Sequence, residues 1–213
     1  MTSKILLLRH AESVEDIDPT LRDSLPDKKI GLTDKGKTQV KQSLNQIAAF
    51  FNECHHCFVS PSNRALETHD MLSGYSFPDF QLPDLVVEPR IRSLNWGNTT
   101  SENRDQIERQ RYEAGVLNYK FPGGENTPQF VDAIREFVDE FKQQFQGENA
   151  LIITHGFALR VLVKAFVRMD DHSFRYLANP PNCFVVKLVQ KPKSFGFALK
   201  SEMPKADPST WIQ

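Results

Sequence analysis

The sequence predicts a single α/β domain covering residues 1–213, with a mostly parallel central sheet flanked by helices on both faces. Uninterrupted aliphatic runs at residues 5–8 and 150–153 are typical of buried parallel strands, in which apolar and polar residues do not alternate. Segments with apolar residues at helical spacing alternate with these and other short apolar runs. A chain of this length can build one substantial core.

In the first half of the chain, Thr33 is expected to cap a helix whose apolar positions recur from Val40 to Phe51 at helical spacing. A third apolar segment ends at Val59, and the next helix is expected to begin just before Arg64. The polar segment 101–117 is also expected to be helical. These elements provide the alternation of strand and helix that the fold class requires.

In the second half, Thr127 is expected to cap a helix with Pro128 at its first position, a favoured arrangement. Five apolar residues at helical spacing should form its core face, namely Phe130, Ile134, Phe137, Phe141 and Phe145. A helix over 157–168, a strand over 184–188 and an edge strand within 195–199 complete the domain. The tail after about residue 204 is expected to be loosely ordered.

Two histidines and two arginines follow the strands of this predicted sheet. His10 and Arg9 come after the first strand, and His155 comes after the strand at 150–153. Ligand sites in open α/β sheets gather beyond the carboxyl ends of the strands. Arg64 falls in the first turn of a helix, where free N–H groups also favour an anion. We predict a phosphate site in which His10 is the nucleophile and the other three side chains grip the phosphoryl oxygens.

Six strings in this order resemble the histidine phosphatase superfamily, which includes cofactor-dependent phosphoglycerate mutases and the phosphatase half of the fructose-2,6-bisphosphate enzymes. They are residues 9–13, 32–36, 60–68, 121–125, 154–156 and 181–183. Together they cover nearly the whole chain. The resemblance implies a phosphoglycerate mutase-like fold and a phosphate group carried on His10.

The sequence departs from this family at the residue that protonates the leaving oxygen. Family members usually carry an acidic side chain there, whereas the corresponding segment, 89–97, has Ser93. Serine does not supply a proton at neutral pH, and a general acid is typically worth roughly 10²–10⁴-fold in rate. Glu88 and Glu12 are the candidate surrogate acids. The alternative for Glu88 is a solvated carboxylate at the end of a strand.

Four further residues are candidates for substrate binding. Ser13 and Gly156 belong to the family strings, and Asp16 stands where many relatives have an asparagine that touches phosphate. A carboxylate would repel phosphate, so we expect Asp16 to point outward or to pair with Arg22. Lys120 lies at the end of the segment that covers the pocket in this family, and is a candidate contact for a charged substrate. The alternative is an ordinary exposed lysine.

Composition excludes several classes of partner. A net charge of −1 provides no general attraction for nucleic acid or an anionic membrane. The four aliphatics before Arg9 are too few for a signal peptide or a membrane span. Three cysteines make an odd count, which favours the cytosol. The sequence His55-His56 between Cys54 and Cys57 lacks a second ligand cluster, so we expect no metal and no cofactor.

The sequence therefore predicts a cytoplasmic phosphatase that hydrolyses phosphomonoesters of a small molecule or a phosphoprotein. A phosphoglycerate-type mutase is a weaker alternative, because the covering segment and the tail offer little to exclude water. A third alternative is a phospho-ligand-binding or regulatory protein with weakened catalysis, which Ser93 and Asp16 motivate.

Overall fold

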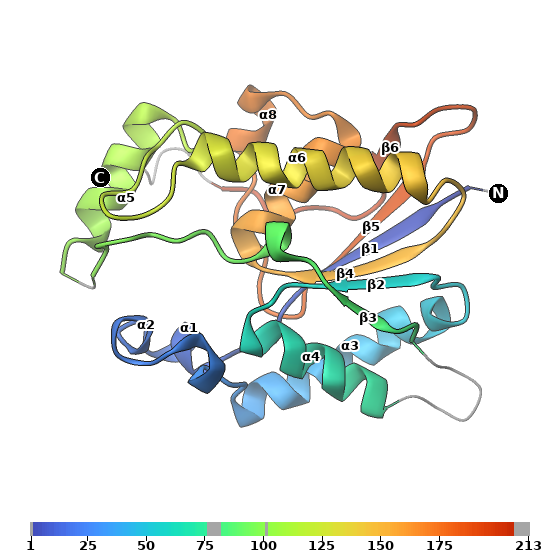
Figure 1. Ribbon diagram of the computed structural model, residues 1–213, viewed down its shortest axis with the longest axis horizontal. Coiled ribbons are helices and arrows are strands. Elements are labelled where there is room, and N and C mark those ends of the chain that lie inside the picture. Colours follow the sequence, from blue (N-terminus) through green and yellow to red (C-terminus); the bar gives the residue numbers. More distant parts are fainter. Residues whose placement is uncertain (1, 76–81, 101, 207–213) are drawn as a thin grey trace.

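The central sheet of the computed structural model, which describes residues 2–75, 82–100 and 102–206, has six strands in the order β3-β2-β4-β1-β5-β6 (Figure 1). The strands are β1 Lys4–Arg9, β2 His56–Val59, β3 Leu85–Val87, β4 Ala150–Thr154, β5 Val185–Gln190 and β6 Phe197–Leu199. Strands β1 to β4 run parallel to one another, and β5 and β6 add two antiparallel pairings, β1 with β5 and β5 with β6, at one edge. The predicted mostly parallel α/β sheet is confirmed.

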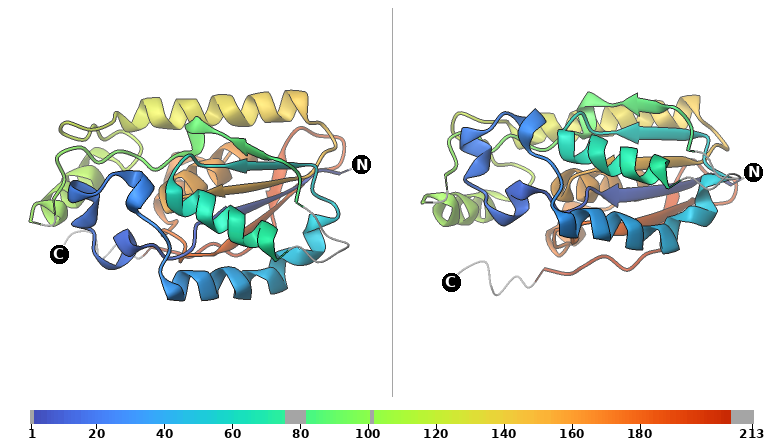
Figure 2. Two further views of the ribbon diagram at one scale, coloured as in Figure 1. Left: turned by 60° about the horizontal axis from the view of Figure 1, so that its bottom comes forward. Right: turned by 90° about the horizontal axis from the view of Figure 1, so that it is seen from below.

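Helices cover both faces of this sheet, as predicted. The helical elements are α1 Val14–Ile17, α2 Leu21–Ser24, η1 Asp27–Lys29, α3 Asp34–Phe51, α4 Asn63–Gly74, η2 Pro89–Ile91, α5 Arg104–Ala114, α6 Thr127–Gln144, α7 Gly156–Val167 and α8 Asp171–Arg175. Helices α3 and α4 pack on one face, and α6 and α7 pack on the other (Figure 1). The short helices α1 and α2 and the helix α5 lie beyond the carboxyl ends of β1 and β4 (Figure 2).

The aliphatic runs of the central strands divide between two cores. In β1, Leu6 and Leu8 belong to the core on the α3 and α4 side, whereas Ile5 and Leu7 belong to the core on the α6 and α7 side. Successive side chains of a strand point to opposite faces, so a strand covered on both faces must be apolar at every position. This requirement explains why the run at residues 5–8 does not alternate with polar residues.

Several predicted boundaries differ from the structure by a few residues. Thr127 is the first residue of α6, and Asn126 precedes the helix as its N-cap. Helix α5 occupies residues 104–114 of the expected 101–117. Residues 204–206 are docked by backbone hydrogen bonds, from Ala178 N to Pro204 O and from Ala206 N to Tyr176 O. The rest of the predicted loose tail lies outside the described residues. No helix in the described ranges combines the length and apolarity needed to cross a bilayer.

Candidate active site

The two histidines meet because their strands are adjacent and parallel. Arg9 of β1 is in register with Thr154 of β4, so His10 and His155 follow at the same edge of the sheet. The His10 backbone N–H donates to the Thr154 carbonyl at 2.9 Å. The two imidazole rings lie with their centroids 4.9 Å apart. The predicted convergence at the strand ends is therefore what the structure shows.

Both histidines border a polar cleft with a volume of about 210 Å³. Six residues of the predicted site line it: Arg9, His10, Asp16, Arg64, His155 and Gly156. Helix α4 brings Arg64 to the cleft from its first turn, and helix α7 begins at Gly156. The free N–H groups at the beginning of a helix attract anions, and guanidinium groups bind phosphate oxygens in pairs. The cleft is thus built to hold an anion.

His10 is held in its neutral form with one defined tautomer. Its Nδ1 lies 2.8 Å from the carbonyl oxygen of Ala11. A carbonyl only accepts hydrogen bonds, so Nδ1 carries the hydrogen and Nε2 carries the lone pair. Burial lowers the pKa of His10 from 6.5 to about 3, with Arg64 and Arg9 acting in the same direction and Asp16 opposing them. A neutral imidazole is suited to act as a nucleophile when one of its nitrogens is held by a hydrogen bond and the other carries a lone pair.

His155 is positioned by the loop that follows β2. Its Nε2 lies 2.7 Å from the hydroxyl oxygen of Ser60, and both residues are buried. Ser60 begins the family string 60–68, so this contact ties that string to the second histidine. The string thus supplies both Arg64 and the hydroxyl that orients His155.

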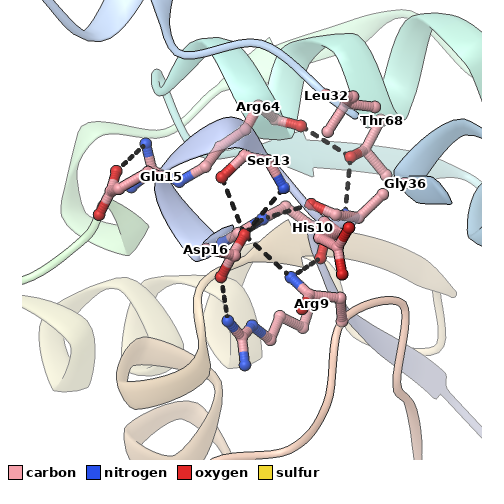
Figure 3. A network of polar contacts seen from close by, with 12 residues as sticks. Arg9, His10, Ser13, Glu15, Asp16, Leu32, Gly36, Arg64 and Thr68 are labelled. Atoms are coloured by element: carbon pink, nitrogen blue, oxygen red, sulfur yellow. Dashed lines mark hydrogen bonds and ion pairs between the residues drawn. The ribbon is translucent and has the colours of Figure 1, made fainter. Parts of the chain in front are cut away.

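Two arginines of the cleft, Arg9 and Arg64, are already paired with carboxylates (Figure 3). Arg9 donates from Nη2 to Asp16 at 2.7 Å and from Nη1 to the carbonyl of Pro180 at 2.7 Å. Arg64 Nη1 lies 3.2 Å from Glu15 and 3.0 Å from Asp27. An incoming phosphate would therefore compete with carboxylates for both guanidinium groups.

The expectation that Asp16 points outward was wrong, and the side chain of Arg22, its other expected partner, lies outside the part of the chain that the structure describes. Its carboxylate lines the cleft and accepts hydrogen bonds from Arg9, from the Ser13 N–H at 2.9 Å and from the Ser13 hydroxyl at 2.8 Å. Burial raises the pKa of Asp16, but the interaction with the N–H of His10, the hydrogen bonds from Ser13 and the positive charge of Arg9 outweigh it and hold that pKa below its ordinary value. The sequence favoured the outward position because no local signal shows which cation a carboxylate will find.

Two contacts fix the loop between β1 and α1 to the helices beneath it. The hydroxyl of Thr68 accepts from the Ala11 N–H at 3.1 Å and donates to the carbonyl of Arg64 at 2.7 Å. At Gly36, a Cβ would lie 2.1 Å from the backbone oxygen of Glu12, so glycine is required for α3 to approach the loop. The strings 32–36 and 60–68 therefore position residues 9–13.

Ser93 lies in the cleft, at the place predicted from the segment 89–97. Glu125 anchors this segment, because its carboxylate forms an ion pair with Arg92 and accepts from the Asn95 N–H at 2.6 Å. The backbone of Gly97 closely approaches that of Gly124, which leaves no room for a side chain. The chain therefore has no carboxyl group at the position expected for an acid.

The candidate surrogate acids lie away from the cleft. Glu88 is buried and accepts two hydrogen bonds from the Arg90 guanidinium, at 2.9 and 2.8 Å, so it is not the solvated carboxylate of the alternative either. Glu12 accepts from Lys35 at 2.6 Å and from the Thr33 hydroxyl at 2.9 Å. Neither residue lines the cleft.

Two other candidates for substrate binding also lie outside the cleft. Lys120 is exposed, and its backbone forms an isolated bridge with Asn126. Ser13 is buried behind Asp16, where it holds that carboxylate and lines no part of the cleft. The structure thus assigns Ser13 a supporting position and gives Lys120 the ordinary surface position of the alternative interpretation.

Among the side chains that line the cleft and were not predicted from the sequence are Glu15, Trp96 and Arg104. The Arg104 guanidinium lies 5.2 Å from the centre of the Trp96 ring, at the end of the cleft that faces α5. Glu15 is only 8 % exposed. The only signal in the sequence was that Glu15 directly precedes Asp16. Because the family resemblance points to position 16 and not to position 15, Glu15 was not predicted. Within the described ranges, no cluster of three or more His, Cys, Asp or Glu side chains could hold a metal ion.

Comparisons with known proteins agree with this geometry. The model of the histidine phosphatase superfamily (branch 1) matches residues 5–201. A phosphoglycerate mutase-like protein, AT74H of Arabidopsis thaliana, is 28 % identical over 204 residues, which cover 86 % of this chain and 72 % of that protein.

Two solved structures share the fold. YhfR of Bacillus stearothermophilus has a TM-score of 0.75 and 21 % identity, with 96 % of this chain and 98 % of that chain covered. A mycobacterial glucosyl-3-phosphoglycerate phosphatase in complex with VO3 has a TM-score of 0.73 and 16 % identity, with 96 % and 99 % covered. The fold, the ordered strings and the family match lead to one conclusion: the chain belongs to the histidine phosphatase superfamily, branch 1.

Proposed function

We propose that this protein is a phosphatase that hydrolyses phosphomonoesters through a phosphohistidine formed on His10. The observation that carries the proposal is the state of His10. The imidazole is neutral, its Nδ1 donates to the Ala11 carbonyl, and it borders a cleft that contains three arginines and a second histidine. Phosphoryl transfer needs mainly positioning and cationic donors, which this cleft supplies.

In the proposed reaction, His10 Nε2 attacks phosphorus while the bond to the ester oxygen breaks. Arg9, Arg64 and His155 hold the equatorial oxygens, on which the negative charge is spread. Water then attacks the phosphohistidine, which releases inorganic phosphate and restores the neutral imidazole. The carbonyl of Ala11 stabilises the positive charge that develops on the ring, because it accepts from Nδ1–H.

In this proposal the substrate is a phosphorylated small molecule or a phosphoprotein, and the protein acts in the cytosol. Support comes from relatives and structural neighbours that include named phosphatases, such as the mycobacterial glucosyl-3-phosphoglycerate phosphatase. The cleft holds both positive and negative groups, which suits a small polar phosphoester. Nucleic acid and membrane partners are not part of the proposal, because the chain has a net charge of only −1.

The test is to trap the intermediate. The protein is incubated with para-nitrophenyl phosphate, digested without acid and analysed by mass spectrometry. An acid-labile phosphate on His10, lost together with turnover in His10→Ala, supports the proposal. The matched control is His172→Ala, since His172 is exposed on α8 and lies outside the cleft. Label on His155 or on a serine contradicts the assignment.

A mutase is the second candidate, since a curated relative is named phosphoglycerate mutase-like. The same phosphohistidine would then pass its phosphoryl group to a second phosphoglycerate rather than to water. Loading His10 with phosphate and adding phosphoglycerates distinguishes the two. Release of inorganic phosphate at an unchanged rate supports the phosphatase, and transfer to the added acceptor supports the mutase.

A third candidate is a phospho-ligand-binding protein with weakened catalysis. It is favoured by the serine at position 93 and by the carboxylates that form ion pairs with Arg9 and Arg64. Such a protein would bind vanadate or phosphate and would release little nitrophenol in the same assay. Comparison of wild type with His10→Ala decides between this candidate and the phosphatase.

A further inference from the structure

In the described part of the chain, two carboxyl groups line the cleft, those of Glu15 and Asp16. Ser93 lines it as well, at the position where relatives usually carry their acid. A poor leaving group, such as a sugar alkoxide, needs a proton as its bond to phosphorus breaks. A phosphatase with this cleft therefore requires an acid from elsewhere in the chain, and the two carboxyl groups are the candidates.

Asp16 is held as an anion and is poorly suited to this task. It accepts hydrogen bonds from Arg9, from the backbone and hydroxyl of Ser13 and, at 3.3 Å, from the side-chain amide of Asn182. Hydrogen bonds to the ionised form favour that form. The pKa of Asp16 accordingly lies below its ordinary value, because the N–H of His10, the Ser13 hydrogen bonds and the charge of Arg9 together outweigh the effect of burial.

Glu15 has a different environment. It is buried on α1, and its Oε2 lies 3.2 Å from Nη1 of Arg64, which also lines the cleft. The same Arg64 nitrogen lies 3.0 Å from Asp27. Arg64 therefore has a second anionic partner besides Glu15, and Glu15 itself borders the cleft.

A bound phosphoester would lie next to the Glu15 carboxyl group, because both would contact Arg64. A phosphate dianion that binds Arg64 brings two negative charges next to a buried carboxylate. Like charges that share a buried site do not both stay ionised, so the proton affinity of one of them rises. The other charged or titratable groups that border the cleft are Arg9, His10, Asp16, Arg104 and His155, and Asp27 faces Arg64 from η1.

We propose that Glu15 is the general acid of this protein and replaces the acid that the chain lacks at Ser93. The inference rests on the proposed phosphatase function. In the first step, the Glu15 carboxyl gives its proton to the ester oxygen as the oxygen–phosphorus bond breaks and the bond from His10 Nε2 to phosphorus forms. In the second step, the Glu15 carboxylate takes a proton from the attacking water as the bond from Nε2 to phosphorus breaks. Glu15 ends the cycle protonated, as it began, so the protein gains and loses no proton over one turnover.

The test compares leaving groups. Wild type and Glu15→Gln are assayed on a series from dinitrophenyl phosphate, whose leaving group needs no proton, to alkyl phosphates, whose leaving group does. We expect kcat/KM of Glu15→Gln to fall roughly 10²-fold or more for alkyl phosphates and less than about fivefold for dinitrophenyl phosphate.

Matched controls are Glu12→Gln and Glu88→Gln, which remove carboxylates outside the cleft and should leave the leaving-group dependence unchanged. A rescue variant guards against a folding defect. Adding Ser93→Glu to Glu15→Gln returns a carboxyl group to the family position, and should recover alkyl phosphate hydrolysis at least tenfold.

The outcomes separate the two proposals. An equal loss across all leaving groups would give Glu15 a merely structural role and overturn the inference, as would no loss at all. A steeper dependence of kcat/KM on the leaving group in Glu12→Gln or Glu88→Gln would identify that residue as the acid and would also overturn the inference. If wild type forms phosphohistidine on His10 and Glu15→Gln behaves like wild type, the acid is refuted and the phosphatase stands. If wild type hydrolyses no member of the series, both proposals fail.

Discussion

Replacing Asp16 with asparagine should tighten the binding of phosphate-like anions. The Asp16 carboxylate holds Arg9 at 2.7 Å and lies 4.0 Å from Nδ1 of His10, so it both repels an anion and occupies one of its cations. Asparagine keeps an oxygen that accepts from the Ser13 N–H and removes the charge. His10 stays neutral in the variant, because Asp16 raises the pKa of His10 and its loss can only lower that pKa further.

The size of the effect follows from Coulomb's law. An anion on the far side of the His10 ring would lie about 8 Å from the Asp16 carboxylate, where two unit charges interact by about 2 kcal/mol at an effective dielectric constant of about 20. The Asp16 side chain is 21 % exposed, so solvent screens part of this repulsion. Because about 1.4 kcal/mol corresponds to tenfold in affinity, we expect roughly tenfold tighter binding of vanadate.

The assay is competitive inhibition of nitrophenyl phosphate hydrolysis by vanadate, at fixed ionic strength. Asp18→Asn is the matched control, since Asp18 is an exposed carboxylate just after α1 and lies outside the cleft. It removes the same net charge and should change the inhibition constant less than twofold. An unchanged or weaker affinity in Asp16→Asn would show that the ordering of Arg9 by Asp16 outweighs the repulsion, and would refute this reasoning.

Three further predictions concern the same cleft. Arg64→Ala should weaken transition-state stabilisation by about 2–4 kcal/mol in kcat/KM, whereas Arg109→Ala, on the exposed side of α5, should leave it unchanged. Thr68→Val removes two buried hydrogen bonds under the loop after β1, and should lower the free energy of unfolding by about 1–3 kcal/mol in urea titrations. His10 takes up a proton near pH 6.5 in the unfolded chain and only near pH 3 in the native protein. The free energy of unfolding should therefore fall as the pH drops from 6.5 to 3, by up to about 1.4 kcal/mol per pH unit. His10→Asn should make this pH dependence shallower, and an unchanged dependence would contradict the neutral imidazole.

Much of the fold could be predicted because its signals are local. The aliphatic run of β1, the helical spacing over α3 and the apolar face of α6 each lie within one continuous segment. The convergence of His10 and His155 was predictable for a related reason. Each histidine directly follows a buried strand, and adjacent parallel strands end at the same edge. The boundaries at Asn126 and α5 were less certain because capping residues compete within one or two positions.

The strands, the family strings and the meeting of the two histidines with Arg9 and Arg64 in one cleft could thus be predicted from the sequence. The carboxylates that join them became known from the folded chain alone. Glu15 meets Arg64 from a position 49 residues earlier in the chain, while Glu88 is held by Arg90 and Lys120 stays on the surface. An ion pair depends on the distance between two side chains in space. No periodicity or spacing along the chain encodes that distance, so these pairs could not be predicted.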